Sequence, residues 1–424
     1  MSSVDVVIVG AGAAGIAACR MLQAAGLDVR VLDARYRVGG RAHTEQMLGL
    51  PVDMGAAWLH FAEENAFTGI AQEGGFTVIR REPNWGGEAL IGAREPTAEE
   101  REQVGQSWGR YYALIEAAAE AGRDVAVSDV LPADEFRARF DAVMTWAVGV
   151  ESGAVSTVDL ARYAESTHNW AVAQGLGSVV AHAAAGMPVT LGVQVTAIRW
   201  DDKSVRVDTP RGAIRARAAI VTVPTSVMAS EDIKFSPHLP PRFGNAFRAI
   251  PLGVVNKVFV RVEEEALPFA GTTQLIGADN TSRTASYTVR PAGQPLIAAF
   301  FGGELSKELE QRGELEAFAC DELQRIFGAD LVSGIIATQA TGWGQDPWAK
   351  GSYSAARPGQ ADQRAVLGEP VSPTLSFAGE ACSREHYGTL HGAWQSGRRA
   401  ARRVIAHLEK LGYVSRSAGQ RTLT

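Results

Sequence analysis

The chain has 424 residues, of which 46% are hydrophobic and 21% charged, and its formal net charge is −6. This length and composition exclude a disordered chain, and the mildly acidic balance makes a general nucleic-acid binder a poor expectation. Three widely spaced cysteines, Cys19, Cys320 and Cys382, do not form a disulfide scaffold and favour a reducing compartment. No leader pattern and no run of ~18 apolar residues is present, so we expect a cytoplasmic protein without a membrane span.

The first 33 residues predict a strand, a glycine-rich turn, a helix and a second strand. Residues 4–9 are apolar and rich in β-branched side chains, which is typical of a buried parallel strand. Residues 16–25 favour a helix, and residues 29–32 form the next strand, which ends at Asp33. The chain thus opens with the order strand, glycine-rich turn, helix, strand and acid, which is an α/β pattern.

Gly10, Gly12 and Gly15 have the G-x-G-x-x-G spacing at the turn between strand and helix. In that context the first glycine permits a tight turn, the second lets the backbone approach a pyrophosphate, and the third allows the helix to pack closely. Asp33 lies 23 positions after Gly10, where a carboxylate accepts hydrogen bonds from a ribose diol and disfavours a 2′-phosphate. We therefore expect a dinucleotide other than NADP.

The middle of the chain predicts a mostly helical insertion followed by strands. Thr97 and Glu100 have capping-box spacing, and two helical stripes follow, which we interpret as core faces: Val104, Trp108, Tyr111 and Ile115, then Phe136, Phe140, Val143 and Ala147. Further strands are predicted at 193–198, 204–207, 219–223, 253–262, 296–301 and 374–378, and further helices at 315–327 and 391–411.

Several separate sequence blocks resemble the flavin-containing amine oxidase family, which includes monoamine oxidases, polyamine oxidases and lysine-specific histone demethylases. The blocks are VLDARYRVGGR at 31–41, DMGAAWLH at 53–60, AIVTVPTSV at 219–227, GVVNKVFV at 253–260, WGQDPWAKGSYS at 343–354 and FAGEACSREHYGTLHGAWQSGRRAA at 377–401. The segment 81–173 carries no recognised motif.

The resemblance implies a two-domain α/β flavoprotein. A Rossmann-like FAD domain would combine residues 1–80, 175–235 and 365–424. An α+β substrate domain, a mixed sheet plus the helical insertion, would combine 81–174 and 236–364.

The same resemblance implies the FAD-binding residues. Arg41 would bind the pyrophosphate, Glu380 the ribityl chain, and Val195, in a strand, the adenine through main-chain atoms. A solvated arginine and an ordinary exposed carboxylate are the alternatives for Arg41 and Glu380. The full expected set is Gly10, Gly12, Ala14, Gly15, Asp33, Ala34, Arg35, Gly40, Arg41, Gly55, Ala56, Ala57, Trp58, Val195, Gly379, Glu380, Thr389 and Leu390.

Lys257 is the strongest catalytic candidate, because a lysine within an apolar strand needs a reason, and burial would depress its pKa. In the family the lysine at this position holds a water against flavin N5; a snorkelling structural lysine is the alternative. Trp343 and Tyr353 would line the substrate side, with Thr389 at a wall position that is aromatic in monoamine oxidases. His60 resembles polyamine oxidases and would face the substrate or simply be a hydrogen-bonded histidine.

Ser352 stands where some monoamine oxidases carry the cysteine that binds flavin covalently, so non-covalent FAD is expected. No metal is expected, because Cys382, His386 and His391 lack the spacing and the fourth ligand of a zinc site.

The implied reaction transfers a hydride from the carbon next to a substrate nitrogen to flavin N5, giving an imine and then an aldehyde or ketone, while O2 becomes H2O2. The expected partners are a small amine and O2; the sequence does not predict an oligomeric state. An L-amino-acid oxidase, an amine dehydrogenase and a non-catalytic flavin-binding partner protein remain alternatives.

Overall fold

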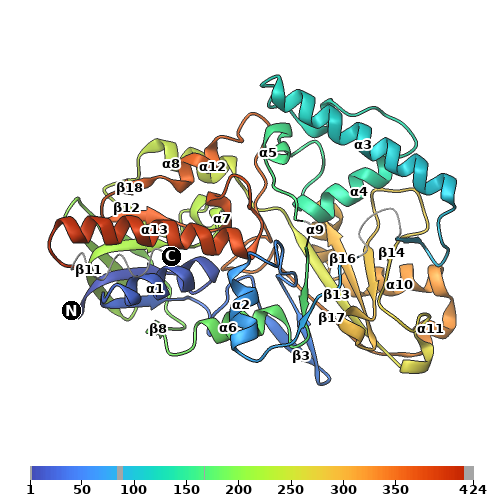
Figure 1. The fold of residues 1–424 in the computed structure, drawn as a ribbon, viewed down its shortest axis with the longest axis horizontal. Helices are drawn as coiled ribbons and strands as arrows, with labels where there is room; N and C mark the ends of the chain where they lie inside the picture. Colours follow the sequence, from blue (N-terminus) through green and yellow to red (C-terminus); the bar gives the residue numbers. More distant parts are fainter. Residues whose placement is uncertain (1, 84–88, 167, 415–424) are drawn as a thin grey trace.

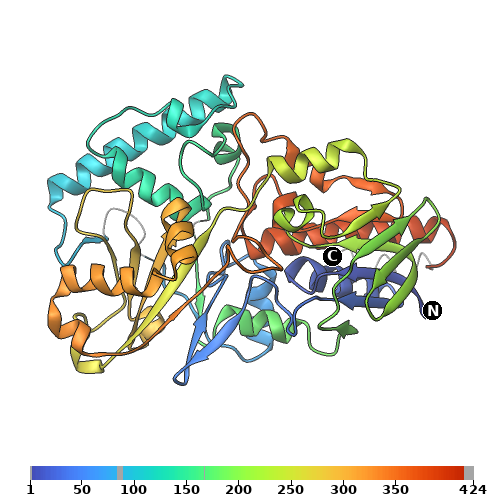
Figure 2. The same ribbon diagram turned by 180° about the vertical axis from the view of Figure 1, so that it is seen from behind.

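Two separate β-sheets organise the protein into two lobes that lie side by side along its long axis (Figure 1). The computed structural model describes residues 2–83, 89–166 and 168–414. A nine-stranded sheet forms one lobe, which contains the N-terminus, and a six-stranded sheet forms the other. The view from behind shows the same separation (Figure 2).

The nine-stranded sheet has β1 (Ser2–Val9) near its centre, paired in parallel with β2 (Val29–Leu32) and β11 (Gly212–Val221). Alternate residues of β1 point to opposite faces, as a strand requires. Val6 and Ile8 pack on α1 (Ala13–Ala24) and α13 (Leu390–Lys410), which run side by side. Val7 and Val9 belong to the core on the other face, with α8 (Pro241–Ala249) and α12 (Gln363–Gly368).

The remaining strands of this sheet come from the middle and the end of the chain. They are β8 (Val189–Thr190), β9 (Ala197–Trp200), β10 (Val205–Thr209), β12 (Lys234–Ser236), β18 (Pro370–Ser372) and β19 (Leu375–Phe377), with the short helices α6 (Leu176–Ala183) and α7 (Thr225–Ala229) nearby in sequence. The sheet thus draws strands from all three segments predicted for the FAD domain, and the residue boundaries of both domains stay a prediction.

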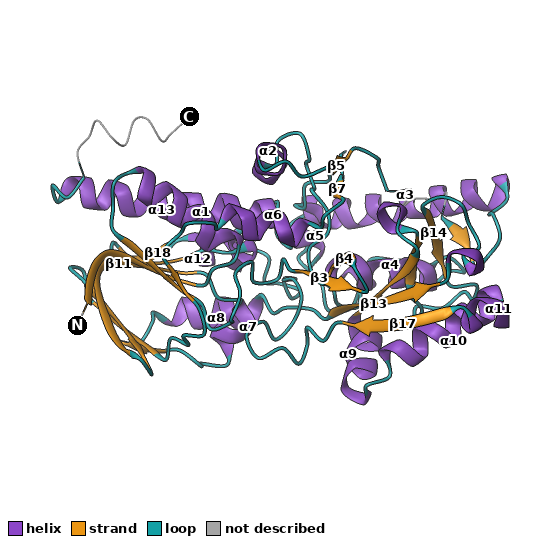
Figure 3. Ribbon diagram, turned by 90° about the horizontal axis from the view of Figure 1, so that it is seen from below, coloured by secondary structure: helices purple, strands orange, loops and turns teal. Residues whose placement is uncertain are grey.

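The six-stranded sheet has the order β17 (Ile335–Ala340), β13 (Val255–Val262), β16 (Leu296–Gly302), β15 (Ser286–Val289), β14 (Thr273–Ile276) and β6 (Leu90–Ile91). One face packs on α9 (Gly303–Arg312), α10 (Leu315–Phe327) and α11 (Ala329–Ser333), as seen from below (Figure 3). Val258 and Val260 of β13 belong to this core, whereas Lys257 and Phe259 alternate to the opposite face, which lines a cavity. The two-residue period of the strand therefore places the Lys257 side chain on the cavity side of the sheet.

The helical insertion consists of α3 (Ala98–Glu120), α4 (Arg137–Val148) and α5 (Thr157–Ala161), which lie above the six-stranded sheet in Figure 1. The capping box of Thr97 and Glu100 is formed, as predicted. Between the sheet lobes lie the hairpin of β3 (Thr44–Met47) and β4 (Leu50–Asp53), α2 (Ala66–Glu73), and the pair of β5 (Val78–Ile79) with β7 (Ala171–Val172) (Figure 3). Single-turn helices lie at 127–129, 264–266, 291–293 and 380–382.

Two sequence expectations were wrong in detail. The helical stripes are only partly core faces: Tyr111 and Phe140 are buried in a cluster, but Trp108, Val143 and Ala147 line the cavity. An apolar helical face indicates only that the face is turned away from bulk solvent. It does not show whether that face packs on a core or lines a ligand cavity.

The strand predicted at 193–198 begins only at Ala197, so Val195 is not in a strand. The preceding backbone crosses the sheet: the Val193 amide donates to the Asp33 carbonyl and the Thr196 amide to the Asp208 carbonyl. Across the described ranges, no helix combines the length and apolar character that a bilayer crossing requires. The cytoplasmic location stays a prediction.

Candidate active site

A single cavity of about 1040 Å³ extends from the glycine-rich turn to the helical insertion and is lined by both lobes. Of the predicted cofactor residues, all but Gly15 line it. All five predicted catalytic residues line it as well: Lys257, Tyr353, Trp343, Thr389 and His60. The structure thus brings together residues that the sequence separates by more than 300 positions.

The glycine-rich turn has the geometry that its spacing predicts. Gly10 has φ +107°, and a Cβ there would lie 2.4 Å from the Thr222 hydroxyl oxygen. A Cβ at Gly15 would lie 1.9 Å from the Gly10 carbonyl oxygen, so Gly15 permits the close approach of α1 without reaching the cavity. At Gly12 the nearest atom would be 3.9 Å away, so protein packing does not require this glycine. Its missing side chain instead leaves room at the start of α1, where main-chain N–H groups favour an anion.

Asp33 is buried at the end of β2. Its carboxylate accepts hydrogen bonds from the Ala11 amide (2.7 Å) and the Arg35 amide (2.8 Å). Burial raises the pKa of Asp33, and the two amide bonds oppose that shift. The carboxylate is held firmly beside the turn, and its predicted bond to a ribose stays a prediction.

The two predicted arginines form different contacts. Arg35 forms a two-pronged ion pair with Asp346 at 2.7 and 2.6 Å, so its charge is already matched by the protein. Arg41 donates to the Ser352 carbonyl at 2.6 Å and to Glu380 at 3.0 Å. Arg41 is therefore no freely solvated surface arginine, and its contacts hold it at the cavity wall.

Glu380 is buried, which removes the alternative of an ordinary exposed carboxylate. It accepts hydrogen bonds from the Ser354 hydroxyl (2.6 Å) and the Gly388 amide (2.7 Å) and pairs with Arg41. Burial raises the pKa of Glu380, but the charges of Arg41 and Arg364, with these hydrogen bonds, outweigh burial and lower it overall. The carboxylate is consequently ionised at neutral pH.

Lys257 projects from β13 toward the segment that carries Gly55. Its ammonium donates to the carbonyl oxygens of Asp53 (2.8 Å) and Gly55 (2.6 Å). Burial lowers the pKa of Lys257 to about 8, against the opposing charge of Asp53. These two main-chain contacts hold the amine inside the protein, which argues against the snorkelling alternative.

Trp343 and Tyr353 are anchored by their polar atoms. The Trp343 indole donates to the Met54 carbonyl (2.9 Å), and its amide donates to the Asn256 side chain (2.9 Å). The Tyr353 hydroxyl donates to the Trp146 carbonyl of α4, and burial raises its pKa. Both rings are thus fixed cavity walls, and their predicted contact with substrate stays a prediction.

His60 lies at the cavity with its Nδ1 atom 2.6 Å from the Asn169 side-chain oxygen. Burial lowers the pKa of His60, which keeps the imidazole neutral at physiological pH. The contact of His60 with substrate stays a prediction.

Thr389 caps α13: its hydroxyl accepts from the Gly392 amide at 3.0 Å and donates to the His386 carbonyl at 2.7 Å. Thr389→Ala is expected to lower the free energy of unfolding by about 1 kcal/mol, the usual value of a helix N-cap. Thr389→Ser should retain most of it. Urea unfolding of both variants checks this, and equal losses in the two would contradict the capping role.

Sequence reasoning missed most of the substrate-side walls, because the insertion and the six-stranded sheet carry no motif. The structure adds Tyr112, Trp146, Tyr163, Glu165 and Phe300 among others. The aromatic residues could have been noticed as a cluster within 108–163, but only the fold assigns them to one cavity. Asn256, next to Lys257, was also missed; its buried side chain holds the Trp343 amide.

The donor set fits the predicted FAD. An anion site at α1 with Arg41, an acid at the end of β2, and the buried Glu380 are arranged along one elongated cavity. No cysteine of the described residues lines this cavity, and the Ser352 hydroxyl donates to the Val255 carbonyl (2.7 Å), which supports non-covalent binding. The described ranges contain no group of three or more His, Cys, Asp or Glu side chains arranged to hold a metal.

Comparison with known proteins agrees with this geometry. The family model for flavin-containing amine oxidoreductases matches residues 13–84 and 94–405. Polyamine oxidase 4 of Oryza sativa subsp. japonica is 29% identical over 435 residues, covering 94% of this chain and 88% of the relative. Lysine-specific histone demethylase 1 homolog 2 of Arabidopsis thaliana is 27% identical over 438 residues, covering 95% of this chain and 58% of the relative.

Solved structures share the fold. Putrescine oxidase bound to putrescine has a TM-score of 0.79 at 22% identity, covering 95% of this chain and 99% of that one. Cyclohexylamine oxidase from Brevibacterium oxydans IH-35A has a TM-score of 0.79 at 23% identity, covering 96% and 99%. The predicted fold class is confirmed. The chain belongs to the flavin-containing amine oxidoreductase family and is an FAD-dependent enzyme that oxidises the C–N bond of amines.

Proposed function

We propose that this enzyme is an oxidase of amines with one nitrogen and an apolar body, and that O2 accepts the electrons to give H2O2. The observation that carries the proposal is the lining of the substrate half of the cavity. It is built mainly from aromatic and aliphatic side chains of the insertion and the six-stranded sheet: Trp108, Tyr112, Ile115, Val143, Met144, Trp146, Leu160, Tyr163, Ile276 and Phe300.

Charge in this half argues against a second ammonium deep in the site. The acidic side chains that the insertion contributes to the described cavity wall are Glu116 and Glu165, and both are exposed. A buried ammonium without a buried carboxylate would lose its hydration uncompensated. A diamine bound with one end at Glu165 is the second candidate, favoured by the position of this residue at the cavity wall.

An amino-acid substrate would need a cation for its carboxylate. In the described part of the chain the cationic side chains that line the cavity are Arg35, Arg41 and Lys257. Each has partners already: Asp346, Glu380 and two main-chain carbonyls respectively. Because these three cations already have partners within the protein, they are poorly suited to bind a substrate carboxylate, which disfavours the amino-acid oxidase alternative.

The chain's own residues supply orientation and protonation control. Bound FAD supplies the two-electron acceptor. The apolar walls favour the neutral amine over the solvated ammonium, and Tyr353 and Trp343 orient its carbon. The amine of Lys257, held beside Gly55, is placed to hold a water and to exchange a proton with it. Water then hydrolyses the released imine to a carbonyl compound and an amine or ammonia.

Anaerobic mixing of the holoenzyme with cyclohexylamine, putrescine and L-amino acids tests the proposal through loss of the oxidised flavin absorbance. Cyclohexylamine should bleach the flavin fastest, and readmitted O2 should restore the colour with one H2O2 per turnover. Faster bleaching by putrescine, with a raised KM for putrescine alone in Glu165→Gln, would support the diamine candidate instead. Slow reoxidation without H2O2 would indicate a dehydrogenase, and a flavin that no amine bleaches would indicate a non-catalytic protein.

A further inference from the structure

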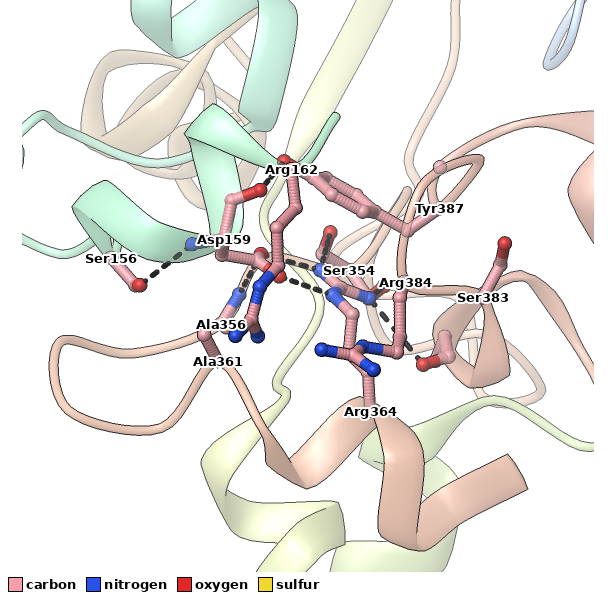
Figure 4. A network of polar contacts seen from close by, with 12 residues as sticks. Ser156, Asp159, Arg162, Ser354, Ala356, Ala361, Arg364, Ser383, Arg384 and Tyr387 are labelled. Carbon is pink, nitrogen blue, oxygen red and sulfur yellow. Dashed lines mark hydrogen bonds and ion pairs between the residues drawn. The ribbon is translucent and has the colours of Figure 1, made fainter. Parts of the chain in front are cut away.

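A fully buried ion pair joins the helical insertion to the FAD-side lobe. Arg364 of α12 has no exposed surface, and its guanidinium donates to both carboxylate oxygens of Asp159 in α5, at 2.6 and 2.8 Å (Figure 4). Asp159 also accepts from the Ala356 amide at 2.9 Å. The two partners are 205 positions apart in sequence, and neither belongs to a recognised motif.

The same guanidinium reaches the cofactor side of the cavity through one hydroxyl. Arg364 donates to the Ser354 hydroxyl oxygen at 2.8 Å, and that hydroxyl donates to Glu380 at 2.6 Å. The guanidinium also stacks on the Tyr387 ring, with its central carbon Cζ 3.8 Å from the ring centroid. Because the Ser354 hydroxyl has a single proton, accepting from Arg364 orients that proton toward Glu380.

Alternating charges run through this network: Asp159, Arg364, Glu380 and Arg41. Arg364 and Arg41 flank Glu380 and together lower the pKa that burial alone would raise. A buried Glu380 with only Arg41 would lose part of the field that keeps it ionised. Arg364 thus acts on Glu380 without reaching the cavity, which it does not line.

The other end of the network supports the substrate wall. Leu160 follows Asp159 directly and lines the cavity. Tyr163 also lines it, and its ring meets that of Tyr387 edge-on with centroids 5.0 Å apart. The Tyr387 hydroxyl donates to the Asp159 carbonyl at 3.1 Å. Movement of α5 would therefore displace the substrate wall and the Arg364 contact together.

We propose that Arg364 is a positioning residue that couples the two halves of the active site: through Ser354 it orients Glu380 toward FAD, and through Asp159 it fixes the substrate wall at α5. This inference rests on the FAD site of the family and does not depend on which amine is oxidised. The competing reading is a structural ion pair that only stabilises the fold.

Ser354→Ala is the mildest test, because it removes the bridge and keeps the ion pair. The apoprotein should unfold at nearly the temperature of Ser372→Ala, a matched loss of a buried serine hydroxyl that bonds Thr374 outside the cavity. FAD titrated into apoprotein should bind Ser354→Ala about 10- to 100-fold more weakly than Ser372→Ala, the range for a hydrogen bond to a charged group. Equal FAD affinity in the two variants would overturn the proposal.

The paired variant Asp159→Leu/Arg364→Met separates positioning from stability. Replacing both members of a buried ion pair by apolar residues often preserves the fold, whereas removing one strands a charge. We expect the paired variant to keep the melting temperature of the apoprotein and to bind FAD about 10-fold more weakly, with a raised KM for the amine and a largely retained kcat. Wild-type FAD affinity and KM in a folded paired variant would establish a purely structural pair.

Hydrogen exchange gives a readout that needs no substrate. FAD binding should slow amide exchange at residues 157–163 of the wild type, although these residues belong to the insertion. In Ser354→Ala at saturating FAD this protection should be reduced, while Ser372→Ala should match the wild type. Absence of FAD-dependent protection at 157–163 in the wild type would contradict the coupling, whatever the enzyme oxidises.

Discussion

Lys257→Met is expected to lower turnover with the best amine about 10²- to 10⁴-fold, the usual contribution of a positioned proton-transfer group. Methionine fills similar space but cannot hold a water or exchange a proton. FAD binding should change little, because Lys257 contacts the Asp53 and Gly55 carbonyls and not the pyrophosphate end. Stopped-flow absorbance would separate flavin reduction from reoxidation. Lys307→Met, on the exposed face of α9, is the control.

The pH dependence of turnover should also differ between the wild type and Lys257→Met. Burial lowers the pKa of Lys257 from its ordinary value of 10.5 to about 8. If turnover requires the neutral form of the Lys257 side chain, the rate rises as pH passes through about 8. This rise should be absent in Lys257→Met. A rise of equal size in the variant would assign it to the substrate amine instead of Lys257.

The lowered pKa of Lys257 also makes the stability of the folded protein depend on pH. Between pH 8 and 10.5 the unfolded chain binds the Lys257 proton and the folded chain does not. The contribution of Lys257 to folding is therefore unfavourable below pH 8 and is relieved as pH rises to 10.5. Relative to Lys257→Met, the wild-type apoprotein should gain melting temperature from pH 7 to pH 10. A constant difference between the two would mean that the folded pKa is not depressed.

The parts of the fold predictable from the sequence are those governed by local physics. The 315–327 helix coincides with α10, and the strand–turn–helix at the N-terminus follows from glycine stereochemistry and an apolar run. Gly55 and Lys257 are recognisable within motifs. The short distance between Gly55 and Lys257 could not be predicted from the sequence, because it depends on how β13 faces the segment after β4.

The parts that sequence could not predict are set by tertiary contacts. Val195 lies in an alternating pattern that favours a strand, yet the backbone is diverted to bond the ends of two other strands. Trp108 and Tyr111 share one helical stripe, but one lines the cavity and the other is core. Arg364 gave no signal at all, since a charged residue in a short helix is ordinarily solvated. Its role depends entirely on a partner 205 positions away.

Gly55→Ala is expected to impair both halves of the site at once. A Cβ at Gly55 would lie 1.8 Å from the Arg41 carbonyl oxygen and 3.2 Å from the Trp343 ring, so the backbone itself must move. That shift should cost about 1–3 kcal/mol in the free energy of unfolding. It should also weaken FAD binding through Arg41 and displace the Gly55 carbonyl that accepts from Lys257 at 2.6 Å.

The matched control for this variant is Gly69→Ala. Gly69 is exposed within α2, and among the described residues nothing outside its sequence neighbours and the backbone of its own helix lies within 4 Å of the position its Cβ would take. Alanine there should stabilise the protein by up to about 1 kcal/mol, because glycine is the weaker helix former. Opposite signs in the two unfolding free energies, with FAD affinity lost only in Gly55→Ala, are the expected result. If Gly55→Ala bound FAD and turned over like Gly69→Ala, the segment 55–58 would be free to adjust. The close packing of Gly55 on the Arg41 carbonyl would then not be what fixes the Gly55 carbonyl that accepts from Lys257.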